Sequence, residues 1–165
     1  MRSGRLDAHR RGMPITSHQV DLVCDSAAAV DDILEDFAAA FYTRLFRERP
    51  DFQPMFSTDP AVQASKLAIE LRRIVSALRD PIRFQRQVRT LGARHGQYGV
   101  KAEHYDATGQ VLLDTFEQEL GEAFTPELHD AWAAAWLTIA AVMLAASDAA
   151  AVPSAEATDE LEEAV

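Results

Sequence analysis

The stretch that most constrains the fold is LGARHGQYGV, at positions 91–100, which contains a single histidine. His95 follows Leu91 by one helical turn, so the two side chains share one face of a predicted helix. Gly96 and Gly99 come next and are expected to end that helix. A lone histidine in such a place is more often a core or capping residue than a ligand. The alternative is a flat cofactor lying against the flexible backbone and taking the neutral imidazole as an iron ligand.

Apolar residues in the rest of the chain recur with the spacing of α-helices and not with the alternation of β-strands. The pairs Asp59-Pro60 and Thr125-Pro126 are typical helix starts. Pro50 and Pro54 predict a turn or a short irregular helix over 49–56. Six helices are predicted. The first starts near Thr16 or Ser17, the second covers 30–45, and the third runs from 60 to before Pro81. The fourth is a short helix that ends at Gly96 and Gly99, the fifth covers 103–120 with Gly121 as its cap, and the sixth starts at 126. The fold class expected from this pattern is all-α.

Length and charge bound the organisation of the chain. It has 165 residues with 16 Lys and Arg against 26 Asp and Glu, which gives a net charge of −10. One domain is expected over 17–147, flanked by a basic extension over 1–16 and an acidic tail over 148–165. Both ends have few large apolar residues and are expected to be disordered. The acidic balance argues against nucleic-acid binding.

Cys24 is the only cysteine, which excludes an intramolecular disulfide and the two-cysteine attachment of c-type haem. A single thiol fits a reducing cytoplasm, and the basic start lacks the apolar stretch of a signal peptide. Residues 131–146 carry no charge but number only 16, below the ~20 that cross a bilayer. We therefore expect a buried helix there and no membrane insertion.

Two further clusters could carry chemistry. Tyr42 lies in an aromatic run with Phe41 and Phe46, and is either a core tyrosine or a hydroxyl donor pointing into a dry cavity. Gln63 and Leu67 are one helical turn apart and face the same way. A surface glutamine beside a core leucine is the plainer interpretation of the second pair.

Taken in order, these fragments resemble the globin family, and most closely the bacterial single-domain globins and the globin domain of flavohaemoglobins. The resemblance covers about residues 17–146. The matching fragments, in order, are Phe41-Tyr42-x-x-Leu45-Phe46-x-x-x-Pro50, Phe56, Gln63-x-x-x-Leu67, Arg94-His95-x-x-x-Gly99-Val100, His104-Tyr105-x-x-x-Gly109-x-x-Leu112-Leu113, and Phe124-Thr-Pro-x-Leu128-x-x-Ala131-Trp132. Each fragment is weak alone, but six in order are specific. The resemblance implies a three-on-three sandwich of six to eight helices around a haem pocket.

The resemblance also implies a role for each matching residue. His95 corresponds to the proximal histidine that binds the iron of haem b. Tyr42 and Gln63 correspond to the polar distal pair, and Leu67 to the apolar residue over the iron. The remaining matches are Phe56 and Val100, which pack on the two haem faces, Tyr105 as a proximal tyrosine, and Arg94, whose guanidinium could reach a haem propionate.

Two donors such as Tyr42 and Gln63 would hold an O2 ligand that gains negative charge, each contributing about 0.5–1.5 kcal/mol. High O2 affinity is therefore expected, which fits scavenging, sensing or O2 chemistry better than bulk delivery. NO and CO are expected as further ligands, and NO dioxygenation would need an external reductase because no G-x-G-x-x-G nucleotide motif is present. The alternatives are a haem-based gas sensor with a partner protein and a haem-free interaction module of the same architecture.

Two sequence features set this chain apart. The proximal glutamate of the flavohaemoglobin pattern falls at about Ser147, so a backbone carbonyl is the expected partner of the His95 ring and strong peroxidase-like activation is in doubt. Residues 72–94 hold seven arginines against Asp80 alone. A solvated helix face is the plainer explanation of this cluster, and docking of an acidic reductase through Arg83 and Arg86 is the functional one.

Overall fold

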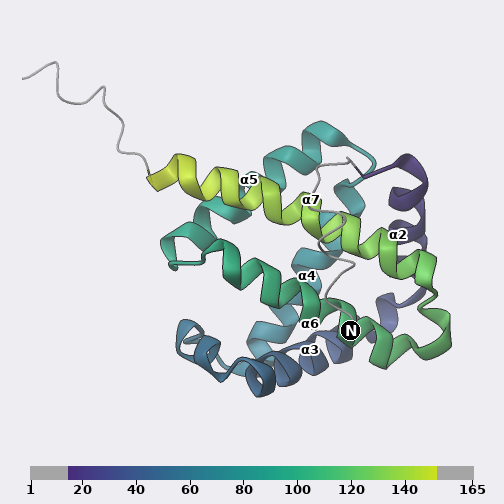
Figure 1. Cartoon of the computed structure of the whole chain (residues 1–165), viewed down its shortest axis with the longest axis horizontal. Coiled ribbons are helices and arrows are strands. Elements are labelled where there is room, and N and C mark those ends of the chain that lie inside the picture. Colours follow the sequence, from purple (N-terminus) through teal and green to yellow (C-terminus); the bar gives the residue numbers. More distant parts are fainter. Residues whose placement is uncertain (1–14, 152–165) are drawn as a thin grey trace, which may run out of the picture.

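The computed structural model describes residues 15–151, and all of the regular secondary structure in that range is helical (Figure 1). Its α-helices are α2 (Ser17–Ala29), α3 (Leu34–Glu48), α4 (Pro60–Ala77), α5 (Pro81–Gln97), α6 (Ala102–Leu120) and α7 (Pro126–Ala151). Three short 3-10 helices join them: η1 (Asp31–Ile33), η2 (Pro50–Met55) and η3 (Gly121–Ala123). The all-α prediction is confirmed.

The helix starts follow the local signals of the sequence. Thr16 caps α2 through a reciprocal capping box with Gln19. Asp59 accepts a hydrogen bond from the Ala61 amide and caps α4, which has Pro60 in its first turn. Asp80 accepts hydrogen bonds from the amides of Ile82 and Arg83 at the start of α5. Each cap satisfies amides that the first turn of a helix leaves without partners.

One boundary differs from the prediction. The apolar run that begins at Val30 is interrupted by η1, so α3 starts only at Leu34. α5 ends at Gln97, between the two glycines that were predicted to end it, and the chain turns at Gly99, which has a φ of 74°. Gly96 also lies against α7, where a Cβ would meet the side chain of Ser147.

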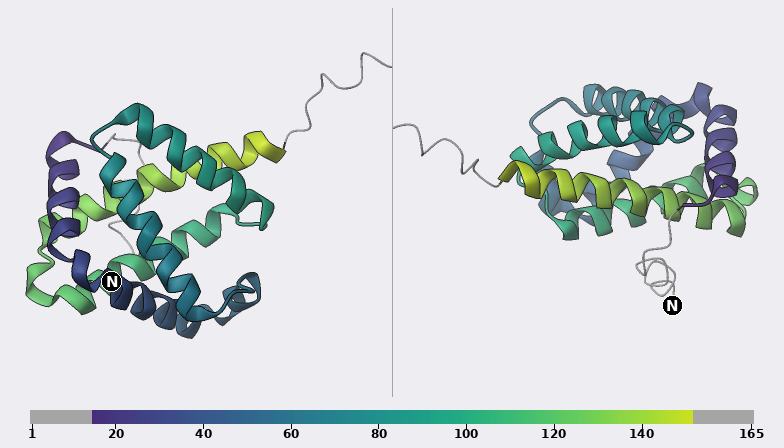
Figure 2. Two further views of the ribbon diagram at one scale, coloured as in Figure 1. Left: turned by 180° about the vertical axis from the view of Figure 1, so that it is seen from behind. Right: turned by 90° about the horizontal axis from the view of Figure 1, so that it is seen from above.

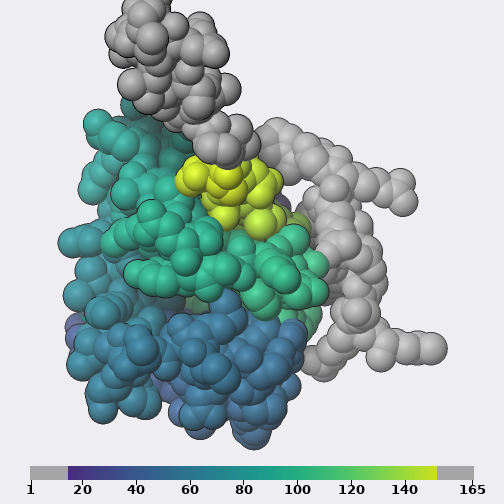
Figure 3. Space-filling view, turned by 90° about the vertical axis from the view of Figure 1, so that its left-hand side faces the viewer, coloured from purple at the N-terminus to yellow at the C-terminus, as the bar shows by residue number. Residues whose placement is uncertain are grey.

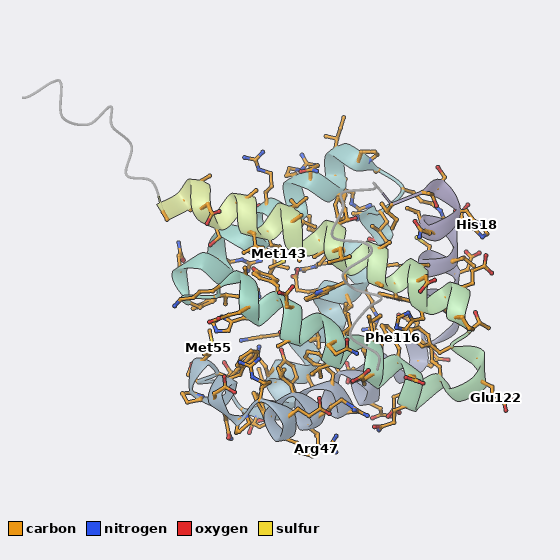
Figure 4. All side chains as sticks on the ribbon, in the orientation of Figure 1. His18, Arg47, Met55, Phe116, Glu122 and Met143 are labelled. Atoms are coloured by element: carbon orange, nitrogen blue, oxygen red, sulfur yellow. The ribbon has the colours of Figure 1, made fainter. Side chains whose placement is uncertain are left out.

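The helices pack in two layers, with α6 and α7 on one side and α4 and α5 lying across them (Figure 2). The most extensive packing is between α5 and α7, and α3 packs against both α4 and α6. Phe116 lies in the middle of the core, with its ring centroid 4.4 Å from those of Phe37 and Trp132 (Figure 4). The arrangement buries one continuous apolar core that includes residues from α2 to α7.

α7 reaches Ala151, four residues past the predicted domain end at 147. The rest of the predicted tail, and residues 1–14 of the predicted extension, lie outside the described residues. By length and composition α7 could cross a membrane, with a mean hydropathy of 1.6 in its most apolar window. The core helix of a soluble protein has the same properties, and α7 packs against α2, α5 and α6.

Candidate functional site

α4 and α5 diverge from the short turn at 78–80, which joins them (Figure 2). Gln63 lies near the start of α4 and His95 near the end of α5, so both lie far from this turn. η2 and the start of α6 come to the surface on the side shown in Figure 3. Gln63 and His95 therefore lie at the end of the α4–α5 pair that is remote from the turn at 78–80.

The His95 ring is anchored to its own helix. Its Nδ1 lies 3.0 Å from the carbonyl oxygen of Leu91, one turn earlier. This carbonyl is the partner expected in the absence of a nearby acid. Burial lowers the pKa of His95 below its ordinary value, the Leu91 hydrogen bond acts the other way, and the positive charge of Arg94 lowers it further. The ring is thus neutral at pH 7, and with Nδ1 as the donor to Leu91 its Nε2 carries a free lone pair.

The segment after His95 is fixed by two contacts. The Val100 amide donates to the His95 carbonyl oxygen at 3.3 Å, which ties the turn at the end of α5 back to the histidine. A Cβ placed on Gly96 would collide with the side chain of Ser147 on α7. Ser147 therefore lies beside the histidine-bearing turn, where the family pattern would place a glutamate.

Tyr42 and Gln63, which the resemblance assigns to the distal pair, contact each other. The Nε2 of Gln63 on α4 donates to the hydroxyl oxygen of Tyr42 on α3 at 3.2 Å. Burial raises the pKa of the Tyr42 phenol, while the Gln63 hydrogen bond acts in the opposite direction, so the phenol stays protonated at pH 7. Because Gln63 donates to the oxygen, the Tyr42 O–H proton remains available to another acceptor.

Apolar side chains surround this pair. The Phe56 ring lies edge-on to Tyr42, with centroids 5.6 Å apart, and edge-on to Phe46 at 5.2 Å. Leu67 follows Gln63 by one turn on α4 and is half-buried, as are Phe46 and Phe56. The rings of Phe46 and Phe56 pack against the Tyr42 ring, and Tyr42 is buried.

Tyr105 lies on the His95 side, with ring centroids 6.5 Å apart. The residue is only 5% exposed, and its hydroxyl is buried with no hydrogen-bond partner among the residues that the structure describes. Burial raises the pKa of this phenol to about 12. The Tyr105 carbonyl accepts from the indole of Trp136 at 3.1 Å, so the backbone here is held by α7.

Comparison with known proteins agrees with this geometry. The family model described as Globin matches residues 39–143. The chain belongs to the globin family. It is 32% identical to the flavohemoprotein of Bordetella pertussis over 126 residues, which is 74% of this chain and 31% of that protein. It is 26% identical over 141 residues to the anaerobic nitrite reductase HBII of Casuarina glauca, covering 76% of this chain and 88% of that protein.

Solved structures give the same fold. A bacterial globin from Campylobacter jejuni matches with a TM-score of 0.73 at 23% identity, covering 81% of this chain and 97% of that one. An engineered carbene transferase, described as a putative nitric oxide dioxygenase from Rhodothermus marinus, matches with a TM-score of 0.75 at 25% identity, covering 82% and 94%. The chain spans about 31% of the length of the Bordetella flavohemoprotein that it matches.

The site residues of this globin fit a haem. The donor set is a neutral imidazole whose second nitrogen is anchored by a carbonyl, which is the usual state of a metal-binding histidine. Half-buried apolar side chains such as Leu67, Leu91 and Val100 offer a surface for a flat macrocycle. The buried Tyr105 hydroxyl, which has no partner among the described residues, lies on the same side as His95. Cys24 lies on α2, with its thiol 3.6 Å from the Val75 carbonyl, and takes no part in this site.

The arginine cluster is divided by the fold. Arg72 pairs with Asp31 at 2.6 Å, and Arg79 pairs with Asp21 at 2.9 Å. Asp80 is the only acidic residue within 72–94. The two aspartate partners were not predicted, because they lie outside that stretch, on α2 and η1. Arg94 is exposed, and its side chain lines a groove between α4 and α5.

Three features of the globin site were not found from sequence. A backbone carbonyl was expected as the partner of His95, but not that Leu91 supplies it, and the packing of Phe46 against both Tyr42 and Phe56 was not predicted. Gly92 and Gly96 bring α5 against α7. The four-residue spacing of these two glycines on one helix face was the available signal, since small residues at that spacing let helix backbones approach closely.

Proposed function

We propose that this globin binds haem b non-covalently between α4 and α5, with His95 as the iron ligand. The observation that carries the proposal is the state of the His95 ring, which is neutral and anchored through Nδ1 to Leu91, so that Nε2 is free. Bound haem would supply a ferrous iron that takes O2, NO or CO. Leu67, Phe56 and Val100 would supply the apolar surroundings that exclude water.

The Tyr42 hydroxyl is proposed to donate a hydrogen bond to the gas ligand. Gln63 donates to the oxygen of that hydroxyl, which turns the hydroxyl proton away from the amide. Gln63 therefore orients the donor more than it acts as a second donor, which refines the expectation of two parallel donors. One charge-assisted hydrogen bond of about 1.5–3 kcal/mol would slow O2 release by roughly tenfold to a hundredfold.

Slow O2 release would in turn favour NO dioxygenation, in which O2, NO and one electron give nitrate. The electron would come from a separate reductase. Support comes from similarity to flavohemoproteins and to a protein described as a putative nitric oxide dioxygenase. The His95 partner is a carbonyl and not a carboxylate, so the chain provides little of the electron push that favours peroxidase-like chemistry.

Absorption spectra of the full chain reconstituted with haem test the first step. Ferric, dithionite-reduced and CO-treated samples should show a Soret band that sharpens and shifts with CO. His95→Ala should abolish this change, whereas His18→Ala should not, because His18 is exposed and pairs with Glu127 at the surface. Failure to retain haem at a one-to-one ratio would leave the haem-free interaction module as the better hypothesis.

Stopped-flow O2 dissociation tests the distal pair. Tyr42→Phe should speed O2 release by about tenfold or more, since it removes the donor and keeps the ring. Gln63→Leu should have a smaller effect in the wild-type background and almost none in Tyr42→Phe. Equal, additive effects of the two substitutions would show that both side chains donate directly.

A further inference from the structure

A groove with a volume of about 370 Å³ runs along the surface between α4 and α5. Arg73 and Glu70 of α4 line one side, and Arg83, Arg86 and Arg94 of α5 line the other. Four arginines against one carboxylate give the groove a local charge of +3 in a chain whose net charge is −10. A concave site with this charge favours an anionic ligand.

The guanidinium groups of the groove are only partly neutralised. Arg73 pairs with Glu70 at 3.0 Å, and Arg83 reaches the Ser76 hydroxyl at 3.5 Å. Arg86 and Arg94 have no ion pair with any residue that the structure describes. By contrast, Arg72 and Arg79 of the same stretch are paired with aspartates of neighbouring elements.

The groove also contains an amide donor without an acceptor. Gln87 lines it, and the Nε2 atom of this side chain is buried with no hydrogen-bond partner in the described part of the chain. Thr90 directs its hydroxyl to the Arg86 carbonyl at 3.0 Å, so it offers no free proton. A buried N–H left unpaired is unfavourable and needs an explanation, and a bound anion would supply the acceptor.

We propose that this groove is a binding site for a linear oligophosphate anion that bridges α4 and α5. Arg83 and Arg94 are separated by about 16 Å along the helix axis, so linked phosphates fit the row of guanidiniums better than one phosphate does. Arg73 would hold the anion from α4, while Arg86 and Gln87 would hold it from α5. The site goes beyond gas binding, and it adjoins that site because Arg94 precedes His95.

Titration calorimetry with inorganic tripolyphosphate tests the proposal on the full chain at low ionic strength, in haem-loaded and haem-free form. The wild-type chain should bind one tripolyphosphate, and Arg86→Gln should weaken binding about tenfold. Arg89→Gln is the matched control, because Arg89 is exposed on the same helix but does not line the groove. It should change the affinity less than twofold. A parallel titration with ATP shows whether a free or a nucleoside-linked oligophosphate is preferred.

Gln87→Met supplies a second readout. It should weaken tripolyphosphate binding several-fold yet raise the melting temperature of the anion-free protein, because it removes the unpaired buried donor and keeps the volume. A variant that merely misfolds would lower the melting temperature instead.

Several outcomes would overturn the proposal. Equal weakening by Arg86→Gln and Arg89→Gln would mean that only overall charge attracts the anion. If the haem-free chain binds tripolyphosphate and the haem-loaded chain does not, the groove belongs to the carboxylates of haem. Binding of polyglutamate without binding of tripolyphosphate would assign it to an acidic protein such as a reductase. Because the readout is heat, these results do not depend on gas binding.

Discussion

Gly92→Ala is the sharpest test of how α5 is positioned. A Cβ at this position would lie 2.5 Å from the Cα of Met143 and 2.9 Å from its carbonyl carbon, whereas ordinary contact begins near 3.4 Å. The Met143 carbonyl oxygen would lie closer still. Backbone atoms of α7 cannot rotate away, so the two helices must separate by about 1 Å to restore ordinary contact. Met143 lies in the C-terminal half of α7, the helix that packs against α5 (Figure 4).

Two opposing effects decide the result. Alanine favours the helix by about 1 kcal/mol relative to glycine. Overpacking of a close backbone contact costs about 1–3 kcal/mol and sometimes more. Because the contact is with main-chain atoms in the most extensive helix pair of the fold, we expect the overpacking to dominate. The net loss should be up to about 2 kcal/mol, which lowers the melting temperature by up to roughly 4–8 °C.

Thermal unfolding followed by circular dichroism measures the loss of stability. Ring nitrogen chemical shifts of His95 measure the displacement of α5, because His95 lies three residues after Gly92 and should move with that helix. Gly99→Ala is the control: a Cβ there meets nothing within 4 Å, but the φ of 74° is strained for alanine. It should cost about 1 kcal/mol and leave α5 unmoved. A Gly92→Ala protein more stable than wild type would refute the close contact.

Three further predictions follow from single contacts. Tyr105→Phe should be neutral or stabilising near pH 7, since it removes a buried hydroxyl without a partner among the described residues. The same substitution should reduce the loss of stability at alkaline pH. In the wild-type protein the folded-state pKa of Tyr105, about 12, exceeds the unfolded value near 10, so its contribution to stability is intact below pH 10 and falls by up to roughly 2–3 kcal/mol towards pH 12. Urea unfolding of both proteins with the same pH dependence would contradict this. Asp80→Ala should cost about 0.5–2 kcal/mol in urea unfolding through loss of the α5 cap, and Asp80→Asn should recover most of it.

Local signals predicted the fold well because they act within one turn of helix. The predicted starts at Thr16 and Asp59 begin helices α2 and α4, and each cap satisfies amides that no later packing would satisfy. The Asp80 cap of α5 was not predicted, because in the sequence Pro81 indicates only the end of the preceding helix. The periodic apolar residues of the chain define the faces that become the core. The break at Val30 was missed, because a continuous apolar spacing does not reveal that η1 lies between two helices.

Contacts between helices were predicted less well, since they depend on which elements meet. Gly96 looks like a helix end in sequence and is a contact with α7 in the fold. The arginines at 72 and 79 look unopposed in sequence and are paired with aspartates more than forty residues away. The Tyr42–Gln63 contact was not predicted, because the resemblance implied only that both side chains donate to the ligand and nothing local links residues 21 positions apart.

The buried polar atoms left unpaired suggest where this chain gives up stability for binding. Natural proteins leave few such atoms, because each costs about 1–3 kcal/mol. Among the described residues, one such atom is Arg44 Nε, which belongs to a guanidinium whose other nitrogens bond to Glu48 and Gln118. The other two are Gln87 Nε2, which lies in the α4–α5 groove, and the Tyr105 hydroxyl, which lies near His95. A purely architectural helical domain would gain by replacing them with methionine and phenylalanine. Their presence beside an anchored, neutral histidine favours a protein that binds ligands over one that serves as a scaffold alone.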